Sequence, residues 1–209
     1  MKRNVCKVAA IAVMMMFSAH VSAQSLGDVL GSVLGNNSQA SDLASGLTSV
    51  FSSNKQATAE KMVGTWTYTE PAIVFTSDNI LAKAASKIAA NKVESKLQEQ
   101  LSKYGIKPGA FSMTFNEDGT FTETLKGKTS KGTWQVKDSK LILSIVGVKA
   151  LTITTQIDGK DMQFVTDATK LLNLFKTLGA KSSNTSIKTV ATLMKSVKGM
   201  QAGITLRKQ

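Results

Sequence analysis

The chain is poor in the two side chains that proteins use most as nucleophiles, general bases and soft-metal ligands. Its 209 residues include one cysteine, Cys6, and one histidine, His20. Both lie in the first 23 residues, which have the form of a secretory signal peptide: a basic start, an apolar run over 8–17 and small residues ending at Ala23. Cleavage after Ala23 would leave a mature chain that begins at Gln24 and lacks both Cys6 and His20. This excludes Ser-His-Asp and Cys-His catalysis, disulfides, and zinc sites with histidine or cysteine ligands.

The chain also lacks a long apolar run after the signal peptide. The run over 8–17 is itself too short to cross a bilayer, which takes about 20 apolar residues. We therefore expect an exported protein, in the periplasm or outside the cell, with no transmembrane segment in its mature form.

Arginine is almost absent, although the chain is strongly basic. The net charge is +12, and removal of three basic residues with the signal peptide leaves 12 − 3 = +9. Arg207 is the one arginine of the mature chain, and the lysines are spread along it. Nucleic-acid readers depend on arginine for two-pronged hydrogen bonds, so we expect no nucleic-acid partner. A solvated lysine surface is favoured, and peripheral contact with an anionic envelope surface is the alternative.

Residues 24–60 are rich in Ser, Gly, Ala and Asn and poor in aromatic residues. Apolar residues at helical spacing occur over 26–34 and 43–51, but glycines weaken the first of these patterns. We interpret this segment as a leader that is weakly helical or disordered. Its apolar residues either dock on the folded domain, a partner or a membrane surface, or belong to a linker.

Residues 61–209 predict one domain that is mainly β with helices. Polar and apolar residues alternate in about eight short segments separated by turns, a pattern that favours an antiparallel barrel of about eight strands. The clearest hairpin covers 110–126, with a turn at 116–119. Apolar stripes at helical spacing predict one helix over 79–103, after the first strand, and two helices over 168–178 and 185–198, before the last strand.

Carboxylates are the remaining candidates for chemistry. Glu117 with Asp118, and Asp158 with Asp161, adjoin turn glycines, where local backbone bonding is the better explanation. Glu123 has the strand parity of its apolar neighbours and points inward, where it needs a partner such as lysine, or else it lies near an open end, which we favour. We predict no catalytic residue, no metal site, no cofactor and no enzymatic activity.

Two short repeats carry a resemblance to a known family: Gly64-Thr65-Trp66 and Gly132-Thr133-Trp134. A Gly-x-Trp on the first strand, about eight antiparallel strands and an arginine on the last strand resemble the lipocalin pattern. The chain is more closely similar to the exported lipocalin-like domains of unknown function found in Bacteroides-type bacteria. The resemblance implies a barrel closed at one end by Gly64, Trp66 and Arg207. The inserted helices depart from the lipocalin plan and leave it open whether the mouth is accessible.

Strand parity then suggests which side chains would line the interior. A lipocalin-like barrel predicts a small apolar or amphipathic ligand, and the candidate lining residues are Tyr68, Phe111, Met113, Phe115, Ile153 and Phe164. The alternative is a structural or interaction protein of the envelope, with an interior filled by its own side chains.

Overall fold

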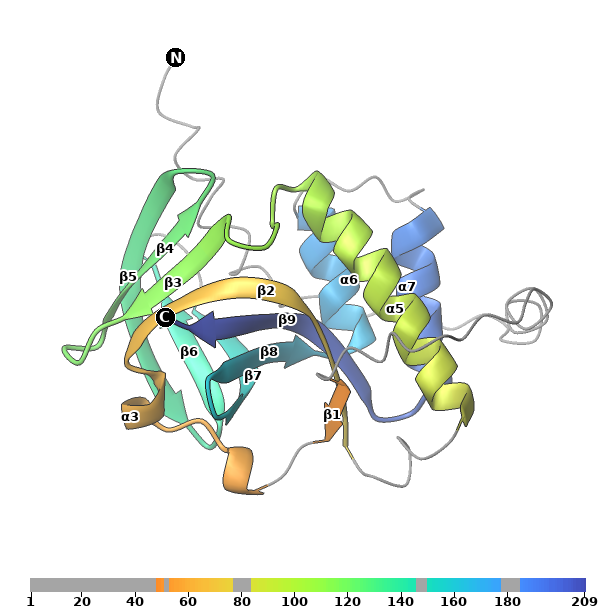
Figure 1. Cartoon of the computed structure of the whole chain (residues 1–209), viewed down its shortest axis with the longest axis horizontal. Helices are drawn as coiled ribbons and strands as arrows, with labels where there is room; N and C mark the ends of the chain where they lie inside the picture. The colour runs from red at the N-terminus through yellow and green to blue at the C-terminus, as the bar shows by residue number, and fades with distance from the viewer. Residues whose placement is uncertain (1–47, 51–52, 77–83, 146–149, 178–184) are drawn as a thin grey trace, which may run out of the picture.

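The computed structural model describes residues 48–50, 53–76, 84–145, 150–177 and 185–209 (Figure 1). The predicted signal peptide and most of the predicted leader lie outside these residues. The strands are β1 (Thr48–Val50), β2 (Gly64–Phe75), β3 (Phe111–Phe115), β4 (Thr120–Leu125), β5 (Lys128–Lys137), β6 (Lys140–Ser144), β7 (Leu151–Asp158), β8 (Asp161–Thr166) and β9 (Met200–Lys208). The helices are η1 (Ser53–Lys55), α3 (Ala59–Met62), α5 (Ala84–Lys103), α6 (Ala168–Thr177) and α7 (Thr185–Ser196).

Strands β2 to β9 form an antiparallel sheet that closes into a ring, because β9 pairs with β2 as well as with β8. Every consecutive pair of strands from β2 to β9 is antiparallel. The predicted barrel, with one helix after the first strand of the ring and two helices before the last, is confirmed.

The hairpin between β3 and β4 shows how the sequence sets the register of the ring. The Asp118 carboxylate accepts hydrogen bonds from the Thr120 backbone N–H at 2.8 Å and the Thr120 hydroxyl at 2.6 Å. Gly119 completes the turn with φ of 77°, a conformation that glycine adopts without steric cost. The turn pairs Phe115 with Phe121, and alternate residues of both strands are therefore buried in the ring.

Strand β2 is long and changes partners along its length. Its first residues pair with β3, whereas residues 66–75 pair with β9, and the register with β9 shifts between Tyr68 and Glu70. This irregularity changes which residues face the core. Trp66 and Tyr68 are buried before it, and Ile73 and Phe75 join the same core after it. The second half of β2 and the start of β9 thus run as a ribbon from the ring toward the helices (Figure 1).

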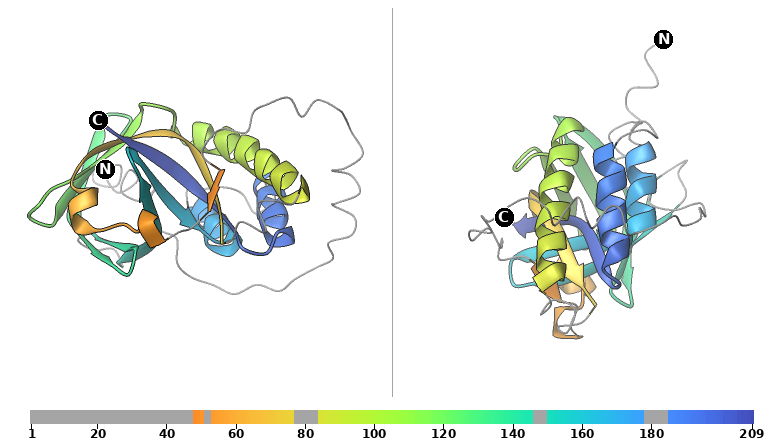
Figure 2. Two further views of the ribbon diagram at one scale, coloured as in Figure 1. Left: turned by 60° about the horizontal axis from the view of Figure 1, so that its bottom comes forward. Right: turned by 90° about the vertical axis from the view of Figure 1, so that its right-hand side faces the viewer.

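The three longer helices form a layer beside one end of the ring, with α7 between α5 and α6 (Figure 2). Helix α5 ends where Ile106 N–H donates to the Leu101 carbonyl, with Gly105 at φ of 86°. At the start of α6, the Asp167 carboxylate accepts from the backbone N–H groups of Thr169 and Lys170, at 2.9 and 3.0 Å. None of the helices in the described ranges is long and apolar enough to span a membrane.

The end of the segment that we interpreted as a leader forms regular structure on the domain. Strand β1 adds to the edge of β2 as a parallel strand at 73–75. After η1, Gln56 forms a bridge with Gln156, and the Lys55 ammonium lies 2.8 Å from the Asp158 carboxylate. Residues 48–50 and 53–60 are therefore part of the folded unit. The segment before them lies outside the described residues.

Candidate functional site

The six predicted lining residues meet in the interior of the ring. Each is at most 1% exposed, and all belong to one hydrophobic core. They come from four strands: Tyr68, Phe111, Met113, Phe115, Ile153 and Phe164. The same core includes apolar side chains of the helices, among them Val93, Leu97 and Phe175. The interior of the ring and the helix layer thus share one core, and ligand binding by these six residues stays a prediction.

Tyr68 links the interior of the ring to the helix layer. Its hydroxyl donates a hydrogen bond to Gln98 Oε1 on α5 at 2.9 Å. Burial, together with the negative charge of Glu70, raises the pKa of the Tyr68 hydroxyl above its ordinary value. The hydroxyl therefore stays protonated and its donor is already used, so its hydrogen is not available to a ligand in this conformation.

Near the start of β2, Trp66 is buried against α3. The indole Nε1–H of Trp66 donates to the Met62 carbonyl at 2.7 Å, and both side chains are fully buried. The Lys208 ammonium lies 5.3 Å from the centroid of the Trp66 ring. Gly64 lies beneath the same lysine, because a Cβ on Gly64 would stand 2.9 Å from Lys208 Cε. Gly64, Trp66 and Lys208 therefore lie together in the structure, and closure of the ring by Gly64 and Trp66 stays a prediction.

The lipocalin resemblance groups Arg207 with Trp66 at the closure of the barrel, but the two side chains face opposite sides of the sheet. Arg207 pairs with Thr67 in the β2–β9 register and points away from the core, whereas Lys208 pairs with Trp66. Neighbouring residues of a strand face opposite sides of the sheet, so one of the two cations faces the indole and the other cannot. The Arg207 guanidinium instead donates to both oxygens of Asp161, at 2.8 and 3.2 Å.

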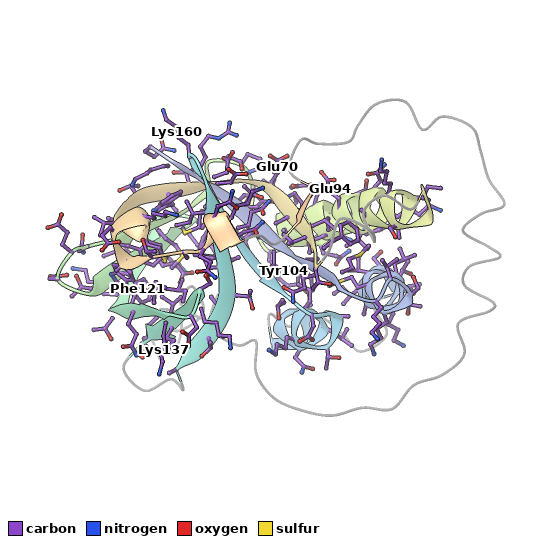
Figure 3. The ribbon with its side chains drawn as sticks, turned by 90° about the horizontal axis from the view of Figure 1, so that it is seen from below. Glu70, Glu94, Tyr104, Phe121, Lys137 and Lys160 are labelled. Atoms are coloured by element: carbon purple, nitrogen blue, oxygen red, sulfur yellow. The ribbon has the colours of Figure 1, made fainter. Side chains whose placement is uncertain are left out.

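Arg207 belongs to a charged group on the outside of the ring. Burial and the charge of Glu94 raise the pKa of Glu70, while Arg207 opposes that rise. Figure 3 shows Glu70 and Glu94 near each other where the β2–β9 ribbon meets α5.

Across the described ranges, no three His, Cys, Asp or Glu side chains are grouped so that they could hold a metal ion.

Glu123 is the one acidic side chain buried inside the ring among the residues described. It is 1% exposed, and it lies opposite Met113 on β3 and Ser130 on β5. Neither carboxylate oxygen has a hydrogen-bond partner in the described part of the chain. Burial raises the pKa of Glu123 from 4.5 to about 8. At neutral pH the carboxyl is therefore mostly protonated in this conformation.

Parity correctly predicted that Glu123 points inward, but our preference for an open end is wrong. Glu123 lies midway along β4, between the buried side chains Phe121 and Leu125. The lysine partner expected for an inward carboxylate is not found either, in the part of the chain described. Strand parity places a side chain on a face of the sheet, but its depth and its partners depend on the neighbouring strands.

The sequence analysis missed two residues that contact Trp66. Lys208 continues the alternation of the last strand after Leu206, so its inward parity was available as a signal. Met62 precedes the first strand of the ring, and nothing in its local pattern indicated that its carbonyl would accept the hydrogen bond of Trp66.

Comparison with known proteins identifies a family and no function. None of the curated proteins matches the chain. Among solved structures, a DUF4847 family protein from Bacteroides vulgatus ATCC 8482, determined at 1.00 Å, is similar at 18% identity and a TM-score of 0.34. The similarity covers 71% of this chain and 95% of that one. The family model described as "Lipocalin-like domain (DUF4923)" matches residues 34–208. The chain therefore belongs to this family of lipocalin-like domains.

Proposed function

We propose that the protein is an exported, non-enzymatic, lipocalin-like binding protein that holds a small apolar or amphipathic molecule inside its ring of strands. Its membership of a lipocalin-like family supports the general class, although the family description includes no function. Export rests on the pattern of residues 1–23.

The observation that carries the proposal is the carboxyl of Glu123. A buried polar group without a hydrogen bond costs free energy, and a core with a purely structural role is more stable with an apolar side chain at this position. A ligand that offers a partner to the two free oxygens would remove that cost. The apolar and aromatic side chains around Glu123 suit the rest of such a molecule.

Three of the four turn carboxylates considered as candidates for chemistry have structural partners, which supports a non-enzymatic protein. Asp118 accepts from Thr120 in a turn, Asp158 pairs with Lys55, and Asp161 pairs with Arg207. Carboxylates held in this way are poorly placed to act as a pair of acid and base on a substrate.

The shared core of ring and helices favours the second candidate, a structural or interaction protein with a filled interior. In this conformation the candidate lining residues belong to one packed core, so a ligand must displace side chains or helices to enter. The two candidates therefore make opposite predictions about the protein isolated from cells.

Native mass spectrometry of the protein purified from cells that export it separates the two candidates. The denatured mass should correspond to a chain that begins at Gln24, which tests export at the same time. We expect extra mass under native conditions that is lost on denaturation and is a small organic molecule. A chain without bound mass, also after incubation with a lipid extract of the same cells, would support the filled structural barrel instead.

A further inference from the structure

The inner wall of the ring has one row of directly paired residues that includes Lys208 and Glu123. Across five neighbouring strands the row consists of Lys208, Trp66, Met113, Glu123 and Ser130. Three strand spacings of about 4.8 Å separate Lys208 from Glu123, or about 14 Å along the wall. The Lys208 ammonium lies over Trp66 and does not reach the Glu123 carboxyl. The acid is thus left without a cation among the described residues of the ring.

The surroundings of Glu123 determine which head group would complement it. Its side chain is bordered by Met113, Phe121 and Leu125, all buried and apolar, and by Ser130 across the strand pair. Two carboxylate oxygens offer about four acceptor sites, and a primary ammonium offers three donors together with the opposite charge. A ligand carboxylate or phosphate offers acceptors only, so it could use only the single donor of the protonated carboxyl and would be repelled by the ionised one.

We propose that Glu123 is the head-group anchor of the ligand site and that the ligand is an amphipathic amine, whose ammonium pairs with the Glu123 carboxylate while its apolar part lies among the side chains of the ring. This inference rests on the proposed ligand-binding function and specifies its ligand class.

Binding of an amine is coupled to the ionisation of Glu123. The neighbouring strands β3 and β5 place no other titratable group against it in the described structure, since their inward residues near it are apolar side chains, Ser130 and Gly132. Elsewhere on the wall, Tyr68 is bonded to Gln98, Lys208 covers Trp66, and Lys128 is exposed at the start of β5. Below a pKa of about 8 the carboxyl must lose its proton to bind the cation. Affinity for an amine should therefore rise by about tenfold per pH unit toward pH 8.

Three probes with the same twelve-carbon tail and different head groups test the inference: dodecylamine, dodecanol and dodecanoate. Their binding to the mature full-length protein is measured by titration calorimetry at pH 7, below the solubility limit of each probe and below micelle formation by the two charged ones. The proteins compared are the wild type, Glu123→Gln, and Glu117→Gln, which makes the same change at an exposed turn position of the same hairpin.

We expect dodecylamine to bind the wild type and the Glu117→Gln variant more tightly than dodecanoate, and to lose about tenfold or more in affinity with Glu123→Gln. Dodecanol should bind all three proteins alike, because an amide can still donate to and accept from a hydroxyl. Glu123→Asp keeps the charge and should keep the preference for the amine, which provides a second variant if Glu123→Gln does not fold.

The outcomes separate the inference from the function on which it rests. Equal affinity of dodecylamine for wild type and Glu123→Gln, with binding of dodecanol, would overturn the anchor and leave the ligand-binding function standing. Tighter binding of dodecanoate than of dodecylamine would also overturn it. Failure of all three probes to bind would contradict the proposed function itself.

Discussion

At the scale of single residues, the burial of Glu123 lowers the free energy of unfolding by an amount that depends on pH. In the folded chain its pKa is raised by burial to about 8, from an ordinary value of 4.5. Between these two values the folded state holds a proton that the unfolded state has lost. The free energy of unfolding therefore falls as the pH rises through this window, by up to about 1.4 kcal/mol per pH unit, and the penalty is complete above pH 8.

The Glu123→Gln variant should lack this dependence. We expect this variant to keep the fold and to be more stable than the wild type at pH 8.5. The difference in stability should disappear as the pH falls toward 4.5. Urea unfolding at several pH values measures the difference, with Glu117→Gln as the control for loss of one surface charge. If the free energies of unfolding of the wild type and Glu123→Gln changed in parallel across the whole pH range, Glu123 would not be buried as an isolated acid.

The two cations at the end of β9 differ in what they contact, and tryptophan fluorescence can distinguish them. In a Trp134→Phe background, which leaves Trp66 as the single tryptophan, Lys208→Met should shift the emission of Trp66 and cost about 0.5–1 kcal/mol of stability. Arg207→Met removes an exposed ion pair with Asp161 and should leave the emission unchanged. The reverse result would restore the arginine contact that the lipocalin resemblance implied.

At the scale of secondary-structure elements, the alternating pattern of the sequence predicts most of the strands because one face of each is buried. The register shift in β2 could not be predicted in the same way. The residues that it contributes to the main core change from even to odd numbers across the register shift between Tyr68 and Glu70. That shift arises from pairing with β9, which is distant in the sequence. The choice between Arg207 and Lys208 depends on the same pairing, so local parity alone could not decide it.

Close contact between β8 and β9 makes Gly203 sensitive to substitution. A Cβ at this position would overlap the backbone carbonyl of Phe164. Because backbone atoms cannot rotate away, Gly203→Ala should force the two strands apart and cost about 2 kcal/mol or more. Thermal unfolding measures the loss.

The comparison variant for Gly203→Ala is Gly159→Ala, in the turn between β7 and β8. Its Cβ would meet nothing within 4 Å, so the substitution costs only the left-handed backbone conformation at φ of 58°, about 1–2 kcal/mol. A loss with Gly203→Ala no larger than that with Gly159→Ala would contradict the close approach of β8 and β9.

At the scale of the whole molecule, one continuous core joins the ring of strands to the helix layer. The sequence predicts the helices from their apolar stripes and the ring from its alternating strands. How they pack together depends on contacts between distant segments, such as Tyr68 with Gln98. The sequence therefore left it open whether the helices leave the mouth of the barrel accessible, and the structure shows their side chains in the same core as the ring.

This shared core predicts that ring and helices unfold together. Leu97→Ala on α5 should lower the stability by about 2–5 kcal/mol, because it leaves a cavity in the common core. Helical circular dichroism and the fluorescence of the two ring tryptophans should still change at the same denaturant concentration. The exposed α5 substitution Ser95→Ala is the control and should have little effect. Loss of the helical signal before the tryptophan signal would mean that the helix layer is a separate unit.

The most direct test of the account is a titration of the Glu123 carboxyl itself, followed by carbon-13 NMR with and without dodecylamine. We predict a pKa near 8 in the protein alone, because burial without a partner disfavours the charged form. In the complex we predict a clearly lower pKa, because the ammonium stabilises the carboxylate. An ordinary pKa near 4.5 in the protein alone, or a raised pKa that dodecylamine does not change, would contradict a buried carboxyl that anchors an amphipathic amine.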